Sequence, residues 1–163
     1  MCICRYAKGA AVMKSVEEFL VYAARLEQEA ALRFDELADA AGSFENTEVA
    51  DFFRQMADYS RMHLEEARKR GGFHDLPEIP PGEYAWPRLE SPEAAAIWAA
   101  DPQMDVSMAL SVALDAETNG LAFYQGVLDG TDDPEIKAMA AEFVEEEAEH
   151  VAAIKRWISR SAA

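Results

Sequence analysis

The stretch from Phe143 to Trp157 constrains the fold more than any other part of the chain. Its apolar side chains recur with the period of an α-helix, at Phe143, Val144, Val151, Ile154 and Trp157. This spacing predicts a helix with one apolar stripe that packs against other elements. Glu147 and His150 lie inside the stripe, three residues apart, so their side chains project from the same face. A carboxylate and an imidazole on a buried face need a partner, because an unpaired buried charge is strongly destabilising.

The composition favours helices in one domain. The chain has 163 residues, of which 50% are apolar, and its frequent Ala, Leu, Glu and Met are good helix formers. We expect a flexible tail over residues 1–14 and a single domain over residues 15–163. No apolar run approaches the roughly 18 residues of a membrane span. The net charge of −16 argues against nucleic acid as a partner, because phosphate binding needs Lys and Arg patches.

The two cysteines, Cys2 and Cys4, stand close together near the start of the sequence. They do not form a disulfide framework, and they fit a reducing compartment. The start also lacks the long apolar region of a signal peptide, because Arg5 and Lys8 interrupt it. We therefore expect a cytoplasmic protein.

Capping signals and apolar stripes predict four long helices. Ser15 and Glu18 form a capping box before the first stripe, which Gly42 stops. Two Asp-Pro pairs, at Asp101 and Asp133, open the third and fourth helices. The predicted helices span residues 15–41, 45–70, 102–129 and 134–159.

A connection rich in Pro and Gly separates the second helix from the third. Ser91-Pro92 predicts a short extra helix within it, to about Ala100. About 30 residues can cross the length of a helix bundle, and one long crossover is the ferritin-like variant of the four-helix bundle. The fold expected is therefore an all-α, ferritin-like bundle. The aromatic residues of the connection, such as Trp86 and Trp98, either cover this bundle or pack on a second subunit.

The two halves of the chain repeat one pattern. Glu27 lies in the middle of the first stripe and is followed seven residues later by Phe34, as Glu117 is followed by Tyr124 in the third. In each half a His follows on the second helix, at a similar separation from the Glu. The inward polar residues that this pattern places at one depth are Glu27, His63, Glu117, Glu147 and His150.

Five such groups at one level are hard to bury without cations. Carboxylates and imidazoles without thiolates suit Fe, Mn or Zn, and di-iron bundles draw a Glu from each of two helices and a Glu-x-x-His from each of the other two. We therefore predict a metal site. The alternative is a metal-free bundle in which Glu and His form hydrogen-bonded core pairs.

At these residues the chain resembles the rubrerythrin-like branch of the ferritin-like superfamily, over roughly residues 15–160. The resemblance implies two iron ions. It places Glu27 and His63 at one ion and Glu117 and His150 at the other, with Glu147 as a bridge. It also implies a homodimer and a di-iron oxidoreductase that reduces peroxide or oxygen, or oxidises ferrous iron.

The sequence departs from this family at two positions. Ser60 stands where the Glu-x-x-His motif of the second helix has its Glu, and Glu66, one turn past His63, is the candidate substitute. Gly120 stands where rubrerythrins proper carry an extra Glu on the third helix. Paired Cys-x-x-Cys motifs, which would bind a rubredoxin-type iron, are also missing. A modified site of this kind leaves open a one-metal centre, Zn or Mn in place of iron, and a non-catalytic role in metal binding or storage.

Overall fold

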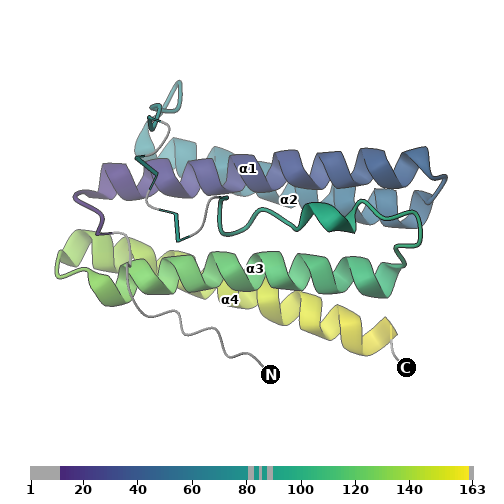
Figure 1. The fold of residues 1–163 in the computed structure, drawn as a ribbon. Coiled ribbons are helices and arrows are strands. Elements are labelled where there is room, and N and C mark those ends of the chain that lie inside the picture. The colour runs from purple at the N-terminus through teal and green to yellow at the C-terminus, as the bar shows by residue number, and fades with distance from the viewer. Residues whose placement is uncertain (1–11, 81–82, 85, 88–89, 162–163) are drawn as a thin grey trace.

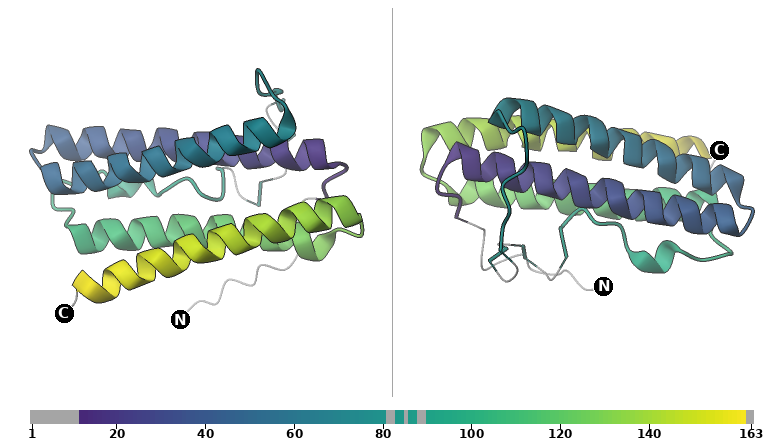
Figure 2. Two further views of the ribbon diagram at one scale, coloured as in Figure 1. Left: turned by 180° about the vertical axis from the view of Figure 1, so that it is seen from behind. Right: turned by 90° about the horizontal axis from the view of Figure 1, so that it is seen from above.

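The computed structural model describes residues 12–80, 83–84, 86–87 and 90–161. Within these ranges it contains four long α-helices, α1 (Val16–Ser43), α2 (Thr47–Gly71), α3 (Val106–Gly130) and α4 (Pro134–Ser161). A single 3-10 turn, η1 (Ile97–Ala99), lies between α2 and α3. The helices form one bundle in which α1 pairs with α2 and α3 with α4, as Figures 1 and 2 show.

Local caps explain where three of the helices begin or end. Ser15 Oγ accepts a hydrogen bond from Glu18 N at 3.0 Å, which fixes the start of α1. Asp133 Oδ1 accepts from the backbone N–H groups of Glu135 and Ile136 and opens α4. Gly72 ends α2 in the left-handed conformation, at φ 67°, where a residue without Cβ carries no steric cost.

The third helix starts later than predicted. We expected it to open at Asp101-Pro102, but α3 begins at Val106, with Asp105 as its cap. The residues after Asp101 form a turn that buries Met104, whose carbonyl accepts a hydrogen bond from Asn46 Nδ2 at 2.6 Å. A helix through this segment would break that hydrogen bond with Asn46, the cap of α2.

The connection between α2 and α3 runs along the bundle from one end to the other (Figure 1). The short helix predicted from Ser91 to about Ala100 is wrong except for η1. Instead, alternate residues are buried, at Ser91, Glu93 and Ala95. The Ala95 carbonyl accepts from Arg33 of α1 at 2.5 Å, so it is not free for a helical hydrogen bond. Trp86 packs edge-on against Tyr22 of α1 and so covers the bundle, at 5.1 Å between ring centroids.

The core continues beyond the predicted domain boundary. Met13, which we expected in a flexible tail, is 4% exposed and packs in the cluster around Phe19 and Tyr124. The rest of the predicted tail, with Cys2 and Cys4, lies outside the described residues.

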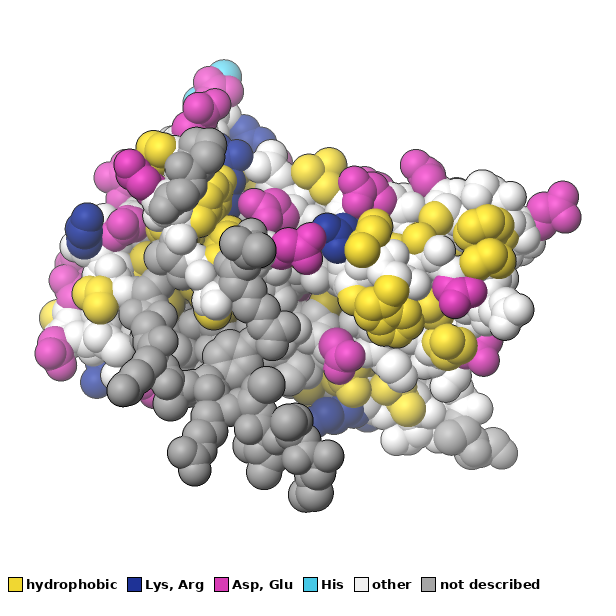
Figure 3. Space-filling model, viewed as in Figure 1, with side chains coloured by type: hydrophobic (Ala, Val, Ile, Leu, Met, Phe, Trp, Pro, Cys, Tyr) yellow, Lys and Arg dark blue, Asp and Glu magenta, His cyan; other side chains and the backbone are white. Residues whose placement is uncertain are grey.

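The outer face carries the net negative charge. Figure 3 shows Asp and Glu side chains spread over one face among fewer Lys and Arg. Among the described residues, none of the helices combines the length and hydropathy that crossing a membrane requires.

Candidate metal centre

The first half of the candidate site comes from the α1–α2 hairpin. Glu27, halfway along α1, is 1% exposed in spite of its charge. The apolar residues before and after it in the stripe hold that face of α1 against the core. His63 of α2 points toward it, and Nδ1 of the imidazole lies 3.5 Å from Glu27 Oε1.

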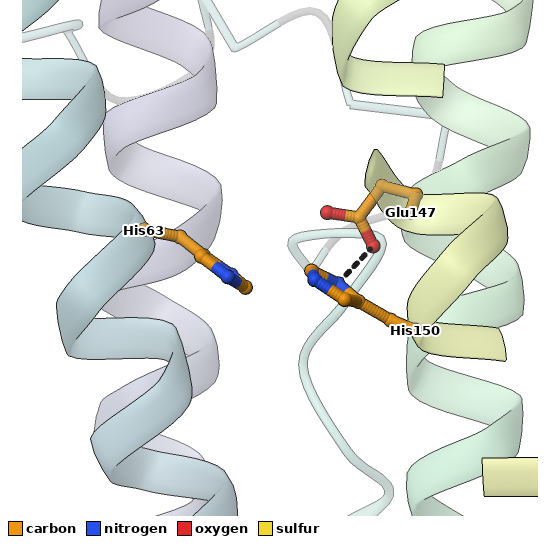
Figure 4. Close-up of side chains that lie close together, drawn as sticks. All are labelled: His63, Glu147 and His150. Atoms are coloured by element: carbon orange, nitrogen blue, oxygen red, sulfur yellow. Dashed lines mark ion pairs between the residues drawn. The ribbon is translucent and has the colours of Figure 1, made fainter. Parts of the chain in front are cut away.

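The second half comes from the α3–α4 hairpin and has the same arrangement with one more carboxylate. Glu117 of α3 and Glu147 of α4 are 5% and 2% exposed. Nδ1 of His150 lies 3.4 Å from Glu117 Oε2 and 3.5 Å from Glu147 Oε2. Figure 4 shows Glu147 and His150 projecting together from α4, as the spacing of three residues predicts.

The two halves meet at the histidines. The rings of His63 and His150 stack at 4.5 Å between centroids, with 8° between their planes (Figure 4). Potential ligand atoms of His63, Glu147 and His150 all lie within 4.8 Å of one another. Glu147 also belongs to a second such group, with Glu27 and Glu93, so this carboxylate is common to both clusters.

Burial makes the charged forms of these carboxyl groups unfavourable. It raises the pKa of Glu27 and raises that of Glu147 to about 8, and the carboxylates of the cluster add to the effect by mutual repulsion. Burial lowers the pKa of His150, but its contacts with Glu117 and Glu147 outweigh burial and raise the pKa to about 10. Without a cation, Glu147 therefore keeps at neutral pH a proton that a carboxyl group would normally release.

The donor set fits a hard or borderline divalent cation. Within the described part of the chain, no hydrogen bond reaches either carboxylate oxygen of Glu27, or Oε2 of Glu117 or Glu147, although all four atoms are buried. Buried oxygens are normally hydrogen-bonded, so a cluster of this kind needs another partner. A metal ion in this position would be that partner. Oxygen and imidazole ligands suit iron, manganese and zinc.

Comparison with known proteins identifies the family. The family model described as Rubrerythrin matches residues 18–158, which contain α2 and α3 and nearly all of α1 and α4. The chain belongs to the rubrerythrin family. A search of curated proteins finds no match.

One solved structure supports the same fold. It is the crystal structure of an uncharacterised conserved protein from Magnetospirillum magnetotacticum MS-1, with 35% sequence identity and a TM-score of 0.65. The likeness covers 90% of this chain and 95% of that one. The predicted all-α, ferritin-like bundle is thus confirmed.

The rubrerythrin motif on α2 remains incomplete in space as well as in sequence. Ser60 is buried, at 2% exposed, but offers a hydroxyl where the motif has a carboxylate. Glu66, the candidate substitute, is half exposed and pairs with Arg70 at 2.7 Å. It borders a cavity of about 10 Å³ beside Glu27 and His63, roughly the space of one water-sized sphere, but does not enter the buried cluster.

The aromatic residues expected near the site divide into two groups. Tyr124 and Phe34 are fully buried, and the Tyr124 hydroxyl has no hydrogen-bond partner among the described residues. Tyr59 lies one turn before His63 on α2, but it is 43% exposed and accepts a hydrogen bond from Gln55. It therefore does not shield the centre.

Sequence patterns did not identify Glu93 as a candidate ligand. It lies in the irregular connection, where no periodicity identifies an inward residue, yet it is 1% exposed and reaches the Glu27–Glu147 cluster. The one available signal was indirect. Gly120 leaves a gap three residues beyond Glu117 on the inward face of α3, and some other side chain has to fill it.

Proposed function

We propose that this rubrerythrin-family protein binds two iron ions between its helix pairs and is a di-iron-type oxidoreductase. The observation that carries the proposal is the position of Glu147, whose carboxylate is shared by two groups of candidate ligands. Membership of the rubrerythrin family supports iron as the metal. The reaction proposed is the reduction of peroxide or oxygen, or the oxidation of ferrous iron.

Each residue of the centre then has a role that suits its place. Glu27 and His63 would hold one ion, and Glu117 and His150 the other, with Glu147 between them. Iron, when bound, supplies the electrons for reduction of the oxidant. The chain fixes the ligand geometry and keeps the centre dry with fully buried aromatic side chains such as Phe34 and Tyr124.

The first test is metal binding by the purified protein. The metal-free protein is loaded anaerobically with ferrous iron, washed and measured by elemental analysis. We expect about two ions per chain for the wild type and at most one for Glu147→Gln. Glu145→Gln, which removes an exposed carboxylate from the same helix, serves as the control and should retain both ions. Iron at background level in the wild type would refute the proposal in favour of a metal-free bundle.

The second test is the redox reaction. Hydrogen peroxide added to the loaded protein should convert ferrous to ferric iron, with new absorption in the near ultraviolet, faster than it oxidises the same iron in buffer. Stable ferrous iron in the presence of peroxide and oxygen would refute the catalytic part and leave the binding part intact.

A second candidate function is non-catalytic metal binding or storage. The buried hydroxyl of Ser60 favours it, because the motif carboxylate of α2 is absent there. It predicts bound metal and a raised melting temperature without turnover. A homodimer, a cytoplasmic location and the absence of nucleic acid among the partners stay predictions of the sequence.

A further inference from the structure

Glu93 occupies the space that Gly120 leaves open on α3. A Cβ atom placed on Gly120 would lie 2.9 Å from Glu93 Oε2 and 3.2 Å from Cδ. The carboxylate of the connection thus lies where a side chain of the helix would otherwise begin. This is the position at which rubrerythrins proper carry a Glu on their third helix.

The connection holds Glu93 in place from both sides. Arg33 of α1 donates hydrogen bonds to the Ala95 carbonyl at 2.5 Å and to Glu90 Oε1 at 3.0 Å. A turn between Ser91 and Ala94, closed by a 3.1 Å backbone hydrogen bond, directs the intervening residues. Glu93 is therefore positioned by its backbone before any ligand binds.

One oxygen of the Glu93 carboxylate has no stabilising contact in the part of the chain that the structure describes. Glu93 Oε2 is buried and has no hydrogen-bond partner among the described residues. Its charged neighbours include two carboxylates, because potential ligand oxygens of Glu27, Glu93 and Glu147 lie within 4.8 Å of one another. A residue that served only to pack the core would not need a charge in such a position.

Adding Glu93 also completes the donor count. The helices alone offer three buried carboxylates and two imidazoles, at Glu27, Glu117, Glu147, His63 and His150. Di-iron bundles use four carboxylates and two imidazoles. Glu93 supplies the fourth carboxylate, although from the opposite side of the bundle to Ser60.

We propose that Glu93 is a metal ligand supplied by the crossover connection, and that its carboxylate takes the place left open at Gly120 and brings the number of carboxylates in the centre to four. The inference rests on the proposed metal centre and adds a ligand to it. The centre is then built by five segments of the chain, α1, α2, α3, α4 and the connection.

Ferrous iron tests the assignment without any assay of activity. Wild type, Glu93→Gln and Glu78→Gln are titrated anaerobically, and stoichiometry and dissociation constants are measured by elemental analysis and calorimetry. Loss of groups that merely orient a ligand weakens metal binding about 10–100-fold, so a direct ligand should cost at least that much. We expect Glu93→Gln to lose one ion, or to bind it at least about 10-fold more weakly. Glu78→Gln, which removes an exposed carboxylate from the same connection, should match the wild type.

The outcomes separate this inference from the proposed function. Full stoichiometry and affinity in Glu93→Gln would overturn the role of Glu93 and leave the metal centre standing. No binding by the wild type would overturn both. Thermal melts of the metal-free variants show whether each is folded.

A transfer of the carboxylate tests the position of Glu93. Glu93→Ala clears the space beside Gly120, and Gly120→Glu in that background returns a carboxylate from the helix. We expect the double variant to recover the ion that Glu93→Ala loses. Failure to recover it would contradict the assignment of Glu93 to the place of a helix ligand.

Discussion

His63 and His150 stack ring against ring, at 4.5 Å between centroids, although they belong to different helix pairs. Each has a buried carboxylate of its own hairpin beside it, Glu27 for His63 and Glu117 for His150. The repeat seen in the sequence is therefore a repeat in space, with the candidate centre at the junction of its halves. A metal ion bound there would tie the two hairpins together.

The stability of the metal-free protein should fall as the pH rises above about 6.5. The pKa of Glu147 is raised to about 8 and that of His150 to about 10, so between about pH 6.5 and 10 the folded chain binds more protons than the unfolded chain. Stability is then greatest at the lower pH and is lost as the pH rises through these values. We expect the melting temperature in EDTA to fall by roughly 5 °C or more from pH 6.5 to 8.5.

The control for this pH dependence is Glu147→Gln, which lacks one of the two titrating groups. Its melting temperature should fall less over the same range. A melting temperature in the wild type that is constant or rises with pH would contradict the raised pKa values.

Glu147→Gln should have opposite effects on the metal-free and metal-loaded protein. In the metal-free protein the variant removes a carboxyl group whose charge is disfavoured by burial, and we expect about 1–3 kcal/mol of added stability at pH 8. With ferrous iron the stabilisation by metal should shrink, because a ligand is lost. Denaturant unfolding with EDTA and with iron measures both, and a loss of stability in EDTA would count against the account.

Gly120→Ala separates helix stability from metal binding in the same way. Ala is the better residue inside a helix by roughly 1 kcal/mol, and the new Cβ meets only the flexible end of Glu93. The metal-free protein should therefore gain stability while the affinity for iron falls, because the carboxylate of Glu93 is displaced. In the Glu93→Ala background, the same substitution should leave the affinity for iron unchanged.

Met13 tests the extent of the core. It is 4% exposed and packs near Phe19, so Met13→Ala should lower the free energy of unfolding by roughly 2 kcal/mol. The neighbouring Val12 is 75% exposed, and Val12→Ala should change it by less than about 0.5 kcal/mol. Equal effects of the two substitutions would restore the flexible tail predicted from the sequence.

Local sequence signals predicted most of the helical framework. The cap at Ser15 lies where the capping box predicts it, and Glu147 and His150 lie together where the helical period predicts them. Both follow from contacts within one helix. At the start of α3, the signal at Asp101-Pro102 misled the prediction, because Met104 is buried in a turn and the helix begins only after Asp105. That later start depends on contacts with other elements, which local patterns do not encode.

The candidate site shows the same division. Glu27, Glu117 and Glu147 were found because each interrupts an apolar stripe. Glu93 was missed because its inward position depends on Arg33 and on the gap at Gly120, both distant in the sequence.

The most direct test of the whole account is the iron content of the wild-type protein after anaerobic loading with ferrous iron and removal of the excess. We expect about two ions per chain. Iron at background level, together with a melting temperature that EDTA and ferrous iron leave unchanged, would contradict it.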